Sequence, residues 1–181
     1  AFNTPLAGVI FAMEVIVAEY TVVGFIPVML AAVSASAVSR TLAGSGAAFA
    51  IPELQLTSLA EMPYIIFLGF SCGLAVVAFI RIARVTARFS HIDVTLRFAA
   101  VGVVTGSLSM LVPEIMGIGY DTLNQALNGE LVVTALIVIA LAKILATAVS
   151  AGAGMPIGII GPNLLIGACI GGALGHLGQQ F

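Results

Sequence analysis

SAGAGMPIGIIGP, residues 150–162, holds four glycines and two prolines between the apolar runs 131–149 and 163–177. Glycine and proline disfavour the interior of a helix, so we expect extended backbone here and a new helix beginning near Ile159–Pro162. Pro162 suits the first turn of that helix, where its missing N–H is not needed. Irregular backbone at membrane depth is tolerated only where it is buried in protein or lines a cavity. The stretch therefore predicts an all-α, multi-pass membrane protein with tilted and broken helices.

The composition of the whole chain predicts lipid as its surroundings. Of 181 residues, 61% are apolar and 8% are charged, whereas an ordinary soluble domain has about 25% charged residues. So few charged side chains cannot build the solvated surface of a soluble enzyme. A chain this apolar is also not a disordered tail. The net charge is −2 and lysine and arginine are thinly spread, so no nucleic-acid partner is expected.

Charged residues divide the rest of the chain into uncharged runs of nearly membrane-spanning length or more. These runs are Tyr20–Ser39, Met62–Ile80 and Phe98–Pro113, with 20, 19 and 16 residues. Four of the six basic residues lie in 81–97, whereas five carboxylates and one arginine lie in 40–61 and 114–130. The positive-inside rule therefore predicts that 81–97 is a cytoplasmic loop and that the two acidic segments face outside.

The chain opens at Ala1 on an apolar stretch with no basic segment before it, so we expect 1–181 to be part of a membrane domain, with no soluble domain. Cys72 and Cys169 each lie within an apolar run, and we expect both to pack as small hydrophobes rather than to form a disulfide or hold a metal. Neither His91 nor His176 accompanies a recognisable nucleophile motif. We therefore expect no enzyme activity, no metal and no cofactor.

The helix predicted to begin near Ile159 offers an anion-binding site made of main chain. The first N–H groups of a helix have no intrahelical partner, and the helix dipole places partial positive charge on them. Such an end binds anions without a cationic side chain. The candidate anion-binding residues are therefore Gly158, Ile159, Ile160, Gly161 and Pro162. The alternative interpretation is a glycine-rich segment that only packs between helices.

Two ionisable residues lie within apolar sequence, where a buried charge is a functional hypothesis by default. Glu14 interrupts the run that opens the chain, and Lys143 interrupts the run 131–149. A proton path or an ion pair would use either residue. Alternatively, each side chain reaches an interface or satisfies helix ends within the bundle.

Two motifs together resemble the CLC family of chloride channels and chloride/proton exchangers. FNTPLAGVIFAMEV at 2–15 is similar to the family's F-N-x-P-L-[AG]-G-[IV]-x-F-x-x-E-E motif. KILATAVSAGAGMPIGIIGP at 143–162 is similar to its [KR]-x-x-x-T-x-x-[ST]-x-[GS]-x-G-x-P-G-G-x-F-x-P motif. The resemblance implies that the chain covers part of the family's membrane domain, about helices H to N in its lettering.

The resemblance also implies roles for individual residues. In the family the anion contacts backbone N–H groups at the second motif, which here implies Ile159 and Ile160. Ile160 stands where the motif has Phe, so an aromatic constriction is not expected. Many exchangers carry a proton-relaying glutamate at the position of Val15, directly after Glu14. Glu14 and Val15 are therefore the proton-path candidates, and the apolar Val15 weakens the expectation of proton coupling.

The function implied is chloride transport across a membrane by a voltage-gated channel or a chloride/proton antiporter. The expected partners are a chloride-like anion, the bilayer and a second copy in a homodimer. Leu6, Met13 and the run 20–39 are the candidate dimer contacts, and a bacterial cell membrane is the expected location. The alternatives are another broken-helix transporter and a non-transporting scaffold that packs through the glycines of 163–177.

Overall fold

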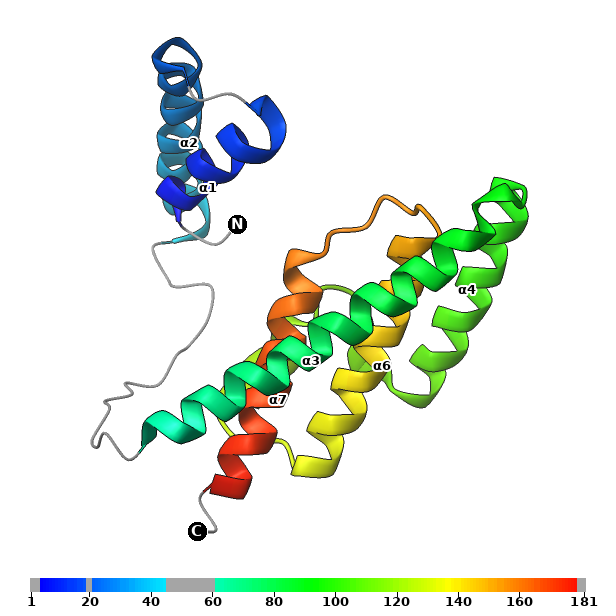
Figure 1. Cartoon of the computed structure of the whole chain (residues 1–181). Helices are drawn as coiled ribbons and strands as arrows, with labels where there is room; N and C mark the ends of the chain where they lie inside the picture. The colour runs from blue at the N-terminus through cyan, green and yellow to red at the C-terminus, as the bar shows by residue number, and fades with distance from the viewer. Residues whose placement is uncertain (1–3, 19–20, 45–60, 179–181) are drawn as a thin grey trace. The chain divides into compact units, whose positions relative to one another are not determined.

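The computed structural model describes residues 4–18, 21–44 and 61–178, and the chain divides into two compact units, 1–50 and 51–181. Every regular element in the described ranges is a helix, which confirms the predicted all-α class (Figure 1). Parts of the sequence-based predictions lie outside the described residues. These parts are Phe2 and Asn3 of the first motif, Tyr20, and most of the acidic segment 40–61.

In the first unit, two short helical segments lie against a longer helix. The elements are α1 (Pro5–Phe11), the π-helix η1 (Ala12–Val17) and α2 (Val22–Ala43). Both α1 and η1 contact α2. Thr21 begins α2 by accepting a hydrogen bond from the Gly24 N–H at 3.2 Å, because a threonine at this position satisfies an N–H that has no helical partner.

The second unit is built around one central helix, α6. Its elements in chain order are α3 (Met62–Ala87), η3 (Arg88–His91), α4 (Val94–Leu111), η4 (Pro113–Ile115), α5 (Tyr120–Leu127), α6 (Val133–Gly152) and α7 (Ile160–Gly178). Helix α6 contacts α3, α4 and α7, and α3 crosses both α6 and α7 (Figure 1). Buried positions recur along α6 from Leu136 to Ser150, so this helix supplies most of the unit's interior.

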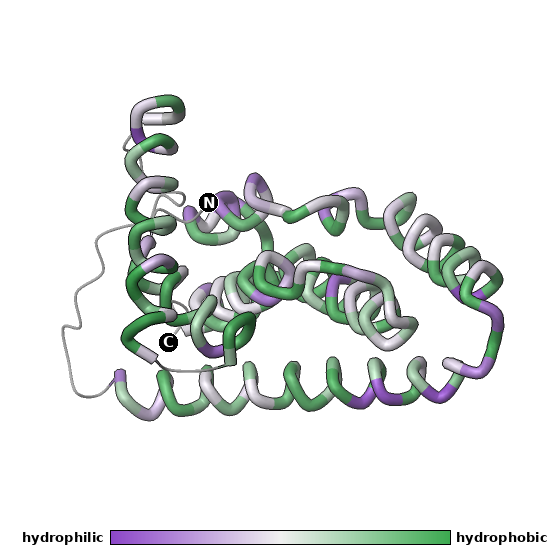
Figure 2. The backbone as a smooth tube through the Cα atoms, turned by 90° about the horizontal axis from the view of Figure 1, so that it is seen from above, coloured by the Kyte–Doolittle hydropathy of each residue, from purple (hydrophilic) through white to green (hydrophobic). Residues whose placement is uncertain are grey.

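Five helices of the described residues are long and apolar enough to cross a membrane. They are Val22–Leu42, Met62–His91, Val94–Leu111, Val133–Gly152 and Ile160–Gly178. Figure 2 shows the apolar character along these helices and a hydrophilic stretch toward one end of α3. Large apolar side chains of α3 stand exposed, including Ile66 at 71% and Phe70 at 64%. Such a surface fits lipid or further protein and not water.

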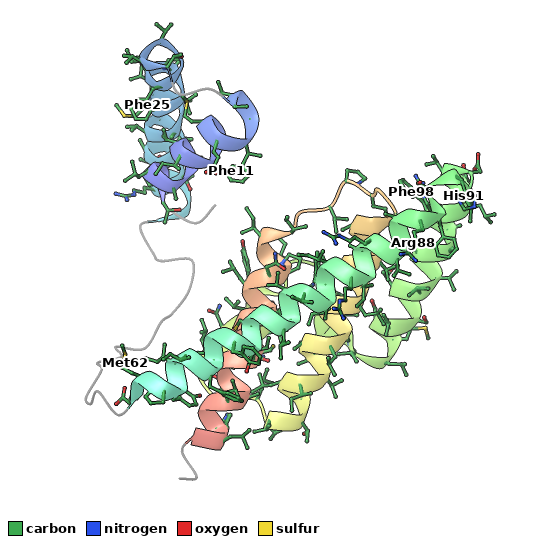
Figure 3. All side chains as sticks on the ribbon, in the orientation of Figure 1. Phe11, Phe25, Met62, Arg88, His91 and Phe98 are labelled. Atoms are coloured by element: carbon green, nitrogen blue, oxygen red, sulfur yellow. The ribbon has the colours of Figure 1, made fainter. Side chains whose placement is uncertain are left out.

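The predicted loop 81–97 is much shorter in the structure. Helix α3 continues through Arg81 and Arg84, and η3 extends the helical path to His91. Arginine is a good helix former, so the charges that end the apolar run do not end the helix. Asp93 then begins α4 by accepting a hydrogen bond from the Thr95 N–H at 2.9 Å. Figure 3 shows Arg88, His91 and Phe98 together at this junction.

The acidic segment 114–130 is also more structured than the expected loop. It contains α5, whose buried face consists of Thr122, Leu123 and Ala126. Helix α5 contacts α7; its Asp121 and Gln125 are exposed, whereas its Leu123 and Ala126 are buried. The acidic stretch is therefore an amphipathic connection that lies against α7.

Candidate functional site

The broken connection between α6 and α7 forms as the sequence predicts. Helix α6 ends at Gly152, and α7 begins at Ile160 after an irregular stretch. Pro162 lies in the first turn of α7, as expected. The Asn163 N–H donates to the Ile159 carbonyl at 3.1 Å. Within the described residues, the N–H groups of 158–161 donate to no backbone carbonyl.

The glycines at this connection differ in their surroundings. A Cβ added to Gly158 would meet nothing within 4 Å, so the main chain there is open. A Cβ on Gly161 would lie 2.6 Å from Ile118 Cγ2, so that glycine is required for packing rather than for ligand approach. Ile159 and Ile160 are each 48% exposed.

A cavity of about 350 Å³ opens at the start of α7. It is lined by Thr105, Ser109, Ile115, Met116, Gly117, Lys143, Ala146, Thr147, Ser150, Ile157, Gly158 and Pro162. Of the predicted anion-binding residues, Gly158 and Pro162 line it, whereas Ile159, Ile160 and Gly161 do not. The cavity also brings Lys143, which the sequence singled out separately, to the same place as the start of α7.

Lys143 is buried at 3% exposure and holds the turn after η4. Its Nζ donates to the Ile115 carbonyl at 2.7 Å and to the Gly117 carbonyl at 2.8 Å. Of the two structural interpretations of this residue, satisfaction of helix ends is therefore confirmed, because Ile115 is the last residue of η4. No carboxylate of the described chain pairs with the ammonium.

The turn that Lys143 holds packs directly on the first turns of α7. The Ile118 side chain fills the position that a Cβ on Gly161 would occupy. A Cβ on Gly119 would lie 2.7 Å from Leu165 Cδ2. Gly119 has φ +81°, a conformation that glycine adopts without strain. Lys143 thus binds the carbonyls of the turn at 115–117, and the residues that follow this turn pack against the start of α7.

The comparison with known proteins covers the entire chain, including both motifs. A family model described as the voltage gated chloride channel matches residues 1–181. The chain belongs to this family. It is therefore an integral, multi-pass membrane protein, in agreement with its five candidate spans. A different broken-helix transporter and a non-transporting scaffold are not favoured, because the match covers the entire sequence.

Individual relatives in the chloride channel family are longer than this chain. A chloride channel protein ClcB-like from Ralstonia nicotianae is 32% identical over 94% of this chain and 41% of its own length. Chloride channel protein CLC-f of Arabidopsis thaliana is 31% identical over 96% of this chain and 24% of its own. The H(+)/Cl(-) exchange transporter ClcA of Vibrio vulnificus is 29% identical over 97% of this chain and 39% of its own. The chain thus spans 24% to 41% of the length of these relatives.

The remaining candidates of this chloride channel family member lie in its first unit. Glu14 and Val15 both belong to the π-helix η1 and are exposed, Val15 at 61%. Leu6 is 67% exposed, as a subunit contact requires. Met13 is only 1% exposed, and its Cε lies 3.8 Å from the position of a Cβ on Gly24. Met13 therefore packs inside its own unit, against α2.

Other side chains of the second unit add little chemistry. Cys72 is half-buried and Cys169 is buried, and both thiols are free. Among the described residues, no three histidine, cysteine or acidic side chains gather as a metal site would require. Thr147, the T of the [KR]-x-x-x-T motif, was not among the candidate site residues; it also lines the cavity, four residues after Lys143 and therefore on the same face of α6. That spacing from a buried lysine was the signal that could have found it.

Proposed function

We propose that the protein carries chloride or a similar small anion across a membrane, as a channel or chloride/proton exchanger. The observation that supports this most directly is the cavity at the start of α7. It combines main chain with unused N–H groups, an open glycine and a buried lysine that pairs with no carboxylate among the described residues. The names of the relatives, chloride channel protein and H(+)/Cl(-) exchange transporter, agree with this proposal.

In this proposal the anion is held mainly by the amino-terminal end of α7. The N–H groups of Gly158, Ile159 and Ile160 supply donors, and the helix dipole adds partial positive charge. Gly161 and Pro162 shape the first turn and fix the direction in which those donors point. Main-chain N–H groups do not titrate at physiological pH and are held in place by the backbone, which suits a site that must bind and release an ion repeatedly.

We also propose that the working protein is a homodimer and that it needs no cofactor beyond the transported ion. Leu6 supports the dimer as an exposed apolar side chain on α1. Val15 supports weak proton coupling, because an apolar side chain cannot hold a proton beside Glu14.

Chloride efflux from vesicles tests the proposed function. The intact protein is reconstituted into vesicles loaded with potassium chloride, and efflux is started with a potassium ionophore in low-chloride buffer. The expected result is chloride release that depends on protein and exceeds that of empty vesicles. Release no faster than from empty vesicles, by protein shown to be folded and inserted, would contradict the proposal.

A further inference from the structure

We propose that the cavity contains a side-chain anion site formed by Thr147 and Lys143, in addition to the main-chain donors of α7. This inference rests on the proposed function, because the ion it binds is the ion that the protein carries. Both residues lie on α6 four positions apart, which places them on one face of the helix. Both line the same cavity as Gly158.

Thr147 is a buried hydroxyl with nothing to bind in the described chain. It is 7% exposed, and no hydrogen bond joins it to another described residue. The other hydroxyls around the cavity are occupied: Thr105, Ser109 and Ser150 each donate to a carbonyl one turn earlier, at 2.7–2.9 Å. Thr147 lines the cavity and its hydroxyl binds no described residue, so its O–H is available to a ligand there.

Lys143 supplies the charge that such a ligand would balance. An ammonium has three N–H donors, and the two carbonyls of Ile115 and Gly117 account for two of them. Those carbonyls are neutral and leave the positive charge of Lys143 uncompensated. A buried charge without a counter-ion is strongly unfavourable. An anion beside Nζ would remove that cost, whereas a cation would increase it.

The space and the donors together define the class of ligand. The cavity of about 350 Å³ admits a small ion with several waters, since about 10–15 Å³ of such volume holds one water. The available groups are an ammonium, a hydroxyl and the open main chain at Gly158, and all of them can donate a hydrogen bond. The ligand is therefore a small monovalent anion that accepts hydrogen bonds and needs no donor of its own.

Chloride titration of purified variants by calorimetry tests the site. Thr147→Val replaces the free hydroxyl with a methyl group, whereas the matched Thr105→Val removes a hydroxyl from the same cavity that already donates to Val101. We expect Thr147→Val to weaken chloride binding by about tenfold or more, the size of one hydrogen bond to a charged group. We expect Thr105→Val to change it by less than about twofold, because its proton is not available to the ion.

A second pair of variants tests the charge. Lys143→Arg retains a cation and its donors, so it should bind chloride more tightly than Lys143→Met. Equal binding by Thr147→Val and Thr105→Val, equal binding by the two Lys143 variants, or no saturable binding by the unaltered protein would each overturn the site. If Lys143→Met does not fold, the threonine pair decides alone, because Thr147 makes no contact that holds the turn.

Chloride efflux from the same preparations keeps the two proposals separate. If the unaltered protein moves chloride while Thr147→Val binds it with full affinity, the side-chain site fails and the proposed function stands. If the unaltered protein binds chloride with the expected variant pattern but moves none, the site stands and the proposed function fails.

Discussion

Gly158 offers the sharpest perturbation of the main-chain donors, because proline at this position removes the N–H and alanine retains it. Gly158→Pro removes the N–H, fixes φ near −65° and restricts the preceding residue. Gly158→Ala keeps the N–H. The structure leaves room for the added methyl group, since a Cβ on Gly158 meets nothing within 4 Å and the glycine does not have a positive φ.

The expected loss follows from the number of donors removed. The N–H groups of 158–161 have no backbone acceptor in the described chain, so an anion there would take up the Gly158 N–H directly. One hydrogen bond to a charged group is worth about 1.5–3 kcal/mol, which corresponds to about 10–150-fold in affinity. Gly158→Pro should therefore lower chloride affinity by at least tenfold on this scale, and Gly158→Ala should lose far less.

The assay is chloride efflux from vesicles at several chloride concentrations, with each variant normalised to the amount of monodisperse protein inserted. The Gly158→Pro protein is expected to need much higher chloride for half-maximal flux, or to carry none. A Gly158→Pro protein as active as Gly158→Ala would refute the role of the helix end. Loss of flux in Lys143→Met combined with an active Gly158→Pro would replace it with a purely cationic site.

Three further predictions concern packing, side-chain identity and protons. Gly152→Ala should destabilise the protein by about 1–3 kcal/mol, because its Cβ would meet the Ala83 carbonyl and lie 2.8 Å from Thr86 Cβ. Thermal unfolding measures this loss. Gly106→Ala is the control, since a Cβ on Gly106 meets nothing within 4 Å. Ile160→Val should leave the preference for chloride over sulfate unaltered in anion-exchange flux, because the N–H remains; reversed selectivity would mean that the side chain lines the path. An outward chloride gradient should drive little or no proton uptake into vesicles, because Val15 cannot titrate; proton uptake in fixed proportion to chloride efflux would show that the valine is no barrier.

The broken connection at the centre of the site could be predicted from sequence, because glycine and proline constrain the backbone locally. The end of α6, the start of α7 and the place of Pro162 in its first turn all follow from residues within 150–162. The limits of α3 could not be read the same way. Charge decides where lipid ends, but helix propensity decides where the helix ends, and Arg81 and Arg84 favour continuation.

The wall of the cavity could not be predicted from local sequence. Lys143 reaches carbonyls 28 and 26 residues away, and those partners exist only once η4 and α6 have packed. Gly161 was expected to give an ion access, but its missing side chain makes room for Ile118, which belongs to another segment. The resemblance made Met13 a candidate dimer contact, whereas its side chain is buried inside its own unit, where an apolar residue serves equally well.

The anion is proposed to lie between the start of α7 and the face of α6 that carries Lys143 and Thr147. Anomalous diffraction from crystals of the intact protein grown in bromide measures this directly, because bromide replaces chloride and is located by its own signal. We expect an anomalous peak in the cavity beside Gly158, Thr147 and Lys143. Well-ordered bromide elsewhere in the protein with none in this cavity would contradict it.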